Sequence, residues 1–318
     1  MTSVRAITEG FAKIPAPIRG AFWMIMAGTI LSVMNVLVRD LADEMHPLQL
    51  VFFRNLGQLL FMMPWLMKIG LGGLRTTRIK MYTLRGVIGI VTMISFFMAI
   101  TMMPIAKATA ISFSAPIFAT LGAALLLGET VRVRRWTATI IGFIGTLIIL
   151  RPGFVEMDLP ILFAIVAAVF LAFSSLIIKS LSSTESPDQI TLYMALYLTP
   201  LSFLPALFVW QWPDLAMLPW LVALGVLATA GHRSLNRAFA AADASAVMPY
   251  DYLRLPVTAL IAYIAFGEGV DAWTWAGAAV IAASSIYIAR RETKLTHKTA
   301  AVPAPEIAAV GEDKGGGR

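Results

Sequence analysis

Ten apolar segments, each long enough to cross a membrane, follow one another along this chain with short polar connections between them. A helix that spans the hydrocarbon core needs about 20 mostly apolar residues. Only 14% of the residues are charged, whereas a soluble domain carries about 25%. The sequence therefore predicts an all-α polytopic membrane protein with ten transmembrane helices. The expected spans are 19–38, 47–67, 81–101, 104–127, 133–151, 159–179, 188–210, 216–236, 244–266 and 270–290.

The basic residues are distributed unequally between the two expected faces of the membrane. Twenty Lys and Arg fall on the face that carries both chain ends, and three (Arg39, Lys107 and Arg151) fall on the other. Cytoplasmic connections are enriched in Lys and Arg, so both termini are expected in the cytoplasm and the chain in the bacterial inner (plasma) membrane. Residues 1–17 would form a cytoplasmic segment, and residues 292–318 a disordered cytoplasmic tail. The net charge of +7 then requires no nucleic-acid partner.

The two halves of the chain resemble each other at a spacing near 140 residues. "HPLQLVFF" (46–53) matches "SPDQITLY" (186–193), and "LLLGETVRVRRW" (125–136) matches "IAFGEGVDAWTW" (264–275). Residues 18–155 and 156–291 are therefore expected to be two five-helix repeats. Because five is odd, the second repeat would enter the membrane from the opposite face. Such inverted repeats support alternating access around a site at the midplane.

Several stretches resemble EamA-type carriers of the drug/metabolite transporter superfamily. These are "FFRN" (52–55), "TLRG" (83–86), "ATAISFSAPIFATLGAALLLGE" (108–129) and "ADASAVMPYDYLRLPVTALIAYIAFGE" (242–268). The resemblance covers roughly residues 18–291. It implies ten helices around a central cavity that the fourth and ninth helices line. Relatives with a similar "YLRLP" run include carriers described for S-adenosylmethionine and for riboflavin.

The segment "PYDYLRLP" (249–256) places two charges and two prolines inside an expected span. Asp251 and Arg254 are three residues apart, so they share a helix face and can pair. Tyr250 precedes Arg254 by four residues and joins that side. Proline removes a backbone donor, and a carbonyl left without its partner must be satisfied by protein or by a cavity. The segment reads as a substrate-binding face, and the alternative is an ion pair that only locks helix nine.

A second intramembrane charge, Arg54, lies in the second span with Gln58 four residues later. With Arg254 it would give the cavity two guanidiniums against one carboxylate. This balance favours an anionic or zwitterionic substrate, because the planar guanidinium suits carboxylate or phosphate. The alternative is that Arg54 pairs with Asp251 or with backbone carbonyls.

Other polar and aromatic residues receive weaker assignments. Phe97, Phe113 and Tyr252 are candidates for stacking on a planar substrate. Arg85 is expected to anchor the third span at the cytoplasmic interface, and His232 to lie alone near a helix end. The remaining small polar residues should make contacts between helices; they are Ser32, Asn35, Ser174 and Ser175.

The preferred function is secondary active or facilitative transport of a small polar metabolite, S-adenosylmethionine-like or an amino acid. A riboflavin-type vitamin uptake carrier is the alternative. An intramembrane lipid-modifying enzyme is disfavoured, since the sequence has no cysteine and no HExxH motif. No catalytic residue, cofactor or metal is expected. The expected partners are the substrate and the lipid bilayer, and a homodimer stays open.

Overall fold

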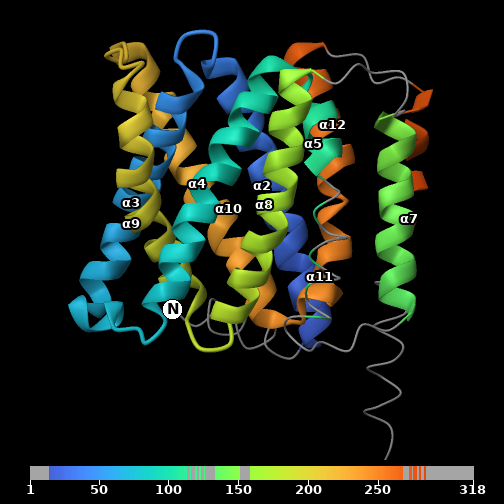
Figure 1. Cartoon of the computed structure of the whole chain (residues 1–318), viewed down its shortest axis with the longest axis horizontal. Coiled ribbons are helices and arrows are strands. Elements are labelled where there is room, and N and C mark those ends of the chain that lie inside the picture. Colours follow the sequence, from blue (N-terminus) through green and yellow to red (C-terminus); the bar gives the residue numbers. More distant parts are fainter. Residues whose placement is uncertain are drawn as a thin grey trace, which may run out of the picture.

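The structure is a computed structural model that describes residues 14–112, 133–150 and 158–267, together with single positions between 115 and 125 and between 272 and 283. Within these residues every regular element is a helix, and the helices stand side by side in one bundle (Figure 1). The α-helices are α2 (Ala16–Leu41), α3 (Pro47–Ile69), α4 (Ile79–Met102), α5 (Ile105–Ser112), α7 (Val133–Leu150), α8 (Leu159–Leu181), α9 (Pro187–Leu207), α10 (Leu218–Ala241), α11 (Ala244–Asp251) and α12 (Arg254–Phe266). Two short 3₁₀ helices, η1 (Leu71–Leu74) and η2 (Leu215–Met217), complete the described elements.

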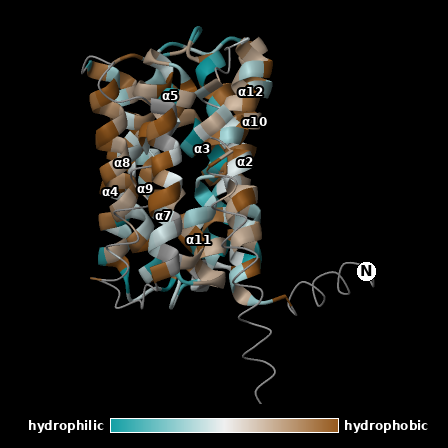
Figure 2. Ribbon diagram, turned by 90° about the vertical axis from the view of Figure 1, so that its right-hand side faces the viewer, coloured by the Kyte–Doolittle hydropathy of each residue, from teal (hydrophilic) through white to brown (hydrophobic). Residues whose placement is uncertain are grey.

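Six of the described helices are long and apolar enough to cross a membrane. They are α2, α3, α4, α8, α9 and α10, the last extended by η2, and they begin and end within a few residues of the expected spans. The expected tenth span falls mostly outside the described residues, and the expected fourth is described as a helix only over α5, so the count of ten stays a prediction. Figure 2 shows hydrophobic residues along most of the length of the helices. Large apolar side chains such as Leu60, Phe173 and Ile264 are exposed on the outside, which is the surface that lipid would cover.

The two repeats start their second helices in the same way. Pro47 begins α3 and Pro187 begins α9, each at the first helical position, where the missing N–H of proline costs nothing. The residue before each proline caps the helix. His46 accepts from the backbone N–H of Leu48 at 3.3 Å, and Ser186 accepts from that of Gln189 at 3.2 Å. The offset of 140 residues between the halves therefore holds in the helices as well as in the sequence.

The packing of the helices repeats between the halves. Helix α2 packs against α10 as α8 packs against α4, and α3 and α9 pack against each other. Helices α2 and α8 run in opposite directions, because opposite ends of them lie beside Ala242. A Cβ on Gly20, near the start of α2, would lie 3.1 Å from the Ala242 Cβ, and Lys179 Nζ, near the end of α8, lies 2.8 Å from the Ala242 oxygen.

The expected ninth span is broken into α11 and α12 at Tyr252 and Leu253. Pro256 has no N–H to donate to the Tyr252 carbonyl, which accepts instead from the N–H of Leu255 at 3.1 Å. The Tyr250 carbonyl likewise accepts from the N–H of Leu253, at 3.2 Å. These tighter bonds end one helical segment and start the next. They place Asp251 at the end of α11 and Arg254 at the start of α12.

Candidate functional site

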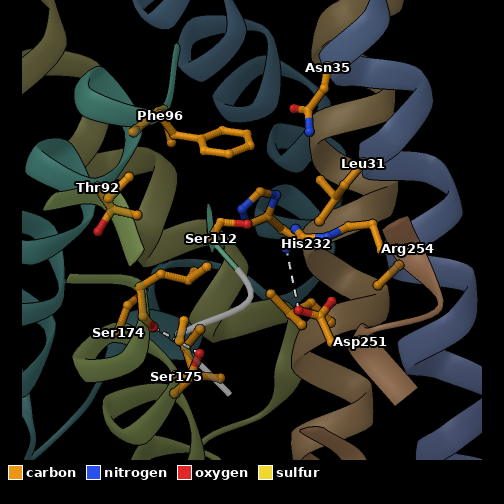
Figure 3. Close-up of a pocket in the computed structure, with 18 of the residues that line it drawn as sticks. Leu31, Asn35, Thr92, Phe96, Ser112, Ser174, Ser175, His232, Asp251 and Arg254 are labelled. Carbon is orange, nitrogen blue, oxygen red and sulfur yellow. Dashed lines mark hydrogen bonds and ion pairs between the residues drawn. The ribbon is translucent and has the colours of Figure 1, made fainter. Parts of the chain in front are cut away.

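A cavity of about 130 Å³ lies inside the bundle, between α2, α4, α8, α10 and the break that separates α11 from α12. Both repeats contribute to its wall. Figure 3 shows side chains from these elements pointing into the same space, with His232 near its middle and Asp251 and Arg254 on one side. Charged, polar, aromatic and small residues all occur in the described lining. They include Gly28, Asn35, Arg54, Arg85, Thr92, Met93, Phe96, Phe97, Ser112, Ala115, Ser174, Ser175, Met194, His232, Phe239, Asp251 and Arg254.

Asp251 and Arg254 form an ion pair at the break in the helix. Arg254 Nη2 lies 3.4 Å from Asp251 Oδ2, and both side chains are largely buried. The stem of Arg254 packs against α2 at Gly28, where a Cβ would lie 3.2 Å from the Arg254 Cβ. The predicted pairing across three residues is therefore present, and it lies on the wall of the cavity.

Arg54 is 1% exposed and also lines the cavity. Its Nη1 donates to Asn55 Oδ1 at 2.6 Å and lies 3.4 Å from Met93 Sδ. Its Nη2 lies 2.8 Å from Nδ1 and 3.2 Å from Nε2 of His232, and Nδ1 is also 3.0 Å from the Ala228 carbonyl. A guanidinium only donates and a carbonyl only accepts, so in the neutral ring Nδ1–H donates to Ala228 and Nε2 accepts from Arg54. Arg54 therefore has neutral partners, and no carboxylate in the described part of the chain pairs with it. The alternative in which Asp251 neutralises Arg54 does not hold in this structure.

Arg85 is the largest departure from the sequence-based expectation. It is 5% exposed and lines the cavity, so the expectation of an interfacial anchor is wrong. Its guanidinium turns toward the middle of α4, since a Cβ on Gly89 would lie 2.7 Å from Arg85 Nη1. The contact that we observe for its charged end is Met194 Sδ, at 3.6 Å from Nη2. A buried charge without a counter-ion costs several kcal/mol, so this arrangement needs a reason.

The expectation that His232 lies alone near a helix end is also wrong. It lies in the middle of α10, lines the cavity and contacts Arg54. The signal that could have identified it is an ionisable residue inside an apolar run, which in a membrane protein is a functional candidate by default. Its assignment to a helix end came from an expected span that stopped five residues before the observed helix does.

Small polar side chains divide between helix contacts and the cavity. Ser32 and Thr258 join α2 to α12 through their hydroxyls at 2.7 Å, which is the predicted kind of contact. Asn35, Ser174 and Ser175 line the cavity; in Figure 3, Ser174 and Ser175 lie across it from Asp251 and Arg254, and Asn35 lies on the same side as Arg254. They supply neutral donors and acceptors to whatever occupies it.

The aromatic candidates are placed differently from one another. Phe97 lines the cavity, together with its neighbour Phe96. Tyr252 is 1% exposed and packs on α7, with its ring 2.6 Å from where a Cβ of Gly142 would lie. Phe113 lies outside the described residues.

Two further candidates lie away from the cavity lining. Gln58 donates from Nε2 to the carbonyl of Thr191 at 3.2 Å and so joins α3 to α9. Tyr250 is buried in an apolar cluster with Val247 and Ala238. Substrate contact by Gln58, Tyr250 and Tyr252 therefore stays a prediction from sequence, whereas Arg54, Asp251, Arg254 and Phe97 share one cavity.

Comparison with known proteins gives this cavity a context. The EamA-like transporter family matches residues 18–151 and 158–290, one match in each half. The chain is 34% identical over 284 residues to the riboflavin transporter of Rhizobium johnstonii, covering 88% of this chain and 94% of that protein. It is 32% identical over 288 residues to the riboflavin transporter of Vibrio cholerae, with 89% and 96% covered. It is 30% identical over 277 residues to the S-adenosylmethionine uptake transporter of Rickettsia prowazekii, with 87% and 94% covered.

A solved crystal structure shares the fold. It superposes with a TM-score of 0.68 over 89% of this chain and 98% of the other, at 18% identity. The apolar helices, the two matched halves and the transporter relatives agree with one another. The chain therefore belongs to the EamA-like transporter family, as a multi-pass membrane protein that transports a small metabolite.

Proposed function

We propose that this protein carries a small anionic or zwitterionic metabolite across the bacterial inner membrane by alternating access. The observation that carries the proposal is the charge of the cavity. Its described lining holds three guanidiniums, those of Arg54, Arg85 and Arg254, against the single carboxylate of Asp251. A pocket of one sign concentrates ligands of the opposite sign, and guanidinium recognises carboxylate and phosphate through paired hydrogen bonds.

The proposed mechanism uses the two halves as the moving parts. Residues 18–155 and 156–291 would be inverted five-helix repeats, with both termini in the cytoplasm. Support comes from the opposite directions of α2 and α8 and from the repeated packing of α2 on α10 and α8 on α4. The cavity lies between the repeats, where rocking of one against the other would expose it to each side in turn.

Two substrate candidates come from the relatives. S-adenosylmethionine carries both charges and an aromatic base, so the Asp251–Arg254 pair and the Phe96–Phe97 wall could each contact part of it. Riboflavin is the second candidate, because Phe96, Phe97 and Phe239 give the cavity an aromatic wall on which a flat ring system can stack. S-adenosylmethionine offers a carboxylate to the guanidiniums, but its net positive charge opposes the excess positive charge of the cavity. The aromatic wall suits both candidates.

The test is ligand-dependent thermal stability of the purified protein, run in parallel with uptake into proteoliposomes. The panel contains S-adenosylmethionine, riboflavin, amino acids and nucleotides. A ligand at 100 times its Kd should stabilise the folded state by about 2.7 kcal/mol. Arg254→Ala should lose this stabilisation and lower uptake at least about 30-fold, because it removes a buried charged contact worth about 2–5 kcal/mol to a bound partner.

Two variants serve as controls for that test. Arg75→Gln removes a positive charge from an exposed position outside the cavity and should behave as the unsubstituted protein. Asp251→Asn keeps the shape of the side chain and should reduce uptake less than Arg254→Ala does. Normal uptake by correctly inserted Arg254→Ala would contradict the assignment of the broken helix to substrate binding.

A further inference from the structure

The guanidiniums of Arg54 and Arg85 have hydrogen-bond donors that the described residues leave unused. The Nε of each is buried and lacks a partner in that part of the chain. The side chains are 1% and 5% exposed, so bulk water does not take the place of a partner. Both side chains line the cavity, so their guanidiniums face whatever occupies it and carry donors that the described residues do not satisfy.

The two cations face the same cavity from neighbouring helices. Arg54 on α3 contacts Met93 of α4, the helix that carries Arg85, while Asp251 is engaged with Arg254 at 3.4 Å. Like charges held together in a medium of low dielectric repel strongly. An anion between them would relieve that repulsion and fill the unused donors at the same time.

The local sequence of α4 makes room for such an anion. Gly89 leaves the space into which the Arg85 guanidinium turns. The cavity-lining residues Arg85, Thr92 and Phe96 share one face of the helix, and the first and last of them are separated by about 16 Å along its axis. An elongated molecule with an acidic group at one end and a flat ring at the other would match this face.

We propose that Arg85 and Arg54, flanked by His232, form an oxyanion subsite that takes the carboxylate or phosphate of the transported metabolite. The inference rests on the proposed function, since it names the group of the substrate that the cavity recognises. Arg254 with Asp251 then forms a separate polar contact on the opposite repeat. Arg85 is a substrate-binding residue in this assignment rather than a membrane anchor.

The first experiment needs no knowledge of the substrate. We would measure the Tm of the purified protein in sodium phosphate, sodium acetate and sodium chloride at equal ionic strength. Phosphate or acetate should raise the Tm relative to chloride, and the anion that acts identifies the class. Arg85→Gln and Arg54→Gln should lose the shift, and Arg75→Gln should keep it.

The stability of the ligand-free variants separates binding from structure. Removing a buried cation for which the described residues supply no counter-ion should leave the Tm of Arg85→Gln in chloride equal to or above that of the unsubstituted protein. A fall in Tm with the anion shift retained would mean that Arg85 is structural. Absence of any anion shift in the unsubstituted protein would also overturn the subsite.

The second experiment compares ligands that differ only in an anionic group. The pairs are S-adenosylmethionine with its decarboxylated form, and riboflavin with its 5′-phosphate. The unsubstituted protein should prefer the anionic member of at least one pair, and Arg85→Gln should erase the preference, a change of about ten- to a hundredfold. Arg85→Lys keeps the positive charge but lacks the planar guanidinium, so it should restore part of the preference for the anionic ligand.

The outcomes of the two proposals are distinguishable. An anion shift that depends on Arg85, with no uptake of any panel member, would leave the subsite standing and remove the proposed substrate candidates. In a second outcome, uptake depends on Arg254, but Arg85→Gln prefers the anionic ligand as strongly as the unsubstituted protein does. This outcome would support the carrier and contradict the subsite.

Discussion

Arg54 in α3 and Met194 in α9 occupy equivalent positions in the two repeats, because each lies seven residues after the proline that begins its helix. One position carries a buried charge and the other a thioether, and both line the same cavity. The partners of Arg54 are themselves equivalent: Met93 and His232 each lie nine residues before the end of α4 and α10. A side chain that meets two equivalent residues must lie near the axis that relates the repeats.

At the broken helix the charged residues belong to the second repeat, whereas Arg54 belongs to the first. Helices α5 and α11 begin at Ile105 and Ala244, so an offset of 139 residues pairs Ser112 with Asp251 and Ala115 with Arg254. All four line the cavity. Here the second repeat carries the charges and the first carries small residues. The helices of the two halves therefore occupy equivalent positions. Each of these charged residues, however, has an uncharged residue at the equivalent position of the other half.

The strongest test of the two-repeat arrangement is to determine on which side of the membrane two equivalent connections lie. Asp43 and Ser183 are exposed, lie 140 residues apart and follow α2 and α8. Inversion predicts that a membrane-impermeant maleimide labels Asp43→Cys in intact cells and labels Ser183→Cys only after the membrane is opened. The chain has no cysteine of its own, so the parent protein is an unlabelled background. Labelling of both variants from one side would refute the inverted arrangement.

A smaller effect should distinguish two equivalent helix crossings. Gly57 faces Gly225 between α3 and α10, and a Cβ on Gly57 would lie 2.7 Å from the Gly225 Cα. The equivalent crossing of α9 and α4 has Tyr197 on Gly86, with the tyrosine hydroxyl 2.9 Å from that of Thr83. Gly57→Ala should cost about 1–3 kcal/mol, because the neighbouring atom is backbone and cannot rotate away.

The matched variant for that crossing is Tyr197→Phe. It removes one exposed hydroxyl contact and should change stability by about 0.5 kcal/mol or less. Thermal unfolding in detergent measures both variants. Equal losses of stability in Gly57→Ala and Tyr197→Phe would show that the close backbone contact does not distinguish the α3–α10 crossing from the α9–α4 crossing.

A further expected effect concerns a cation at the end of each first helix. Arg39 Nη1 donates to the Met103 carbonyl at 3.2 Å, and Lys179 Nζ donates to the carbonyls of Phe239 and Ala242 at 3.2 and 2.8 Å. Each cation lies at the C-terminal end of the third helix of its own repeat, where positive charge is favourable. Arg39→Met and Lys179→Met should each cost about 1 kcal/mol, and the double variant should lose their sum. A marked departure from additivity in thermal unfolding would mean that the two ends are coupled.

Much of the fold could be predicted from sequence because lipid imposes a simple rule on composition. The expected segments 47–67 and 159–179 match α3 and α8 to within two residues at each end, since hydropathy reports length directly. The donor that Pro256 lacks was also readable, but the break in helix nine was not: the expected span 244–266 was continuous, and Pro64 and Pro200 lie inside unbroken helices. Asp251 and Arg254 at a spacing of three then had to share a side of that segment.

The candidate site was predicted only in part, because hydropathy does not report which way a side chain points. Arg85 begins an apolar span, and an arginine at that place is equally compatible with an interface or a cavity. The space beside Gly89 that turns it inward is a tertiary feature. Tyr250 and Asp251 are adjacent in sequence, yet a helix rotates successive residues by about 100°, and only Asp251 reaches the cavity lining.

The position of Asp251 and Arg254 at the break also sets how firmly they hold each other. Asp251 is the last residue of α11 and Arg254 the first of α12, so the carboxylate lies at the negative end of one helix dipole and the guanidinium at the positive end of another. Each charge is at the unfavourable end by about 0.3–1 kcal/mol. A substrate of the kind proposed above would therefore compete with an ion pair that both helix dipoles weaken, and the pair could re-form after the substrate leaves.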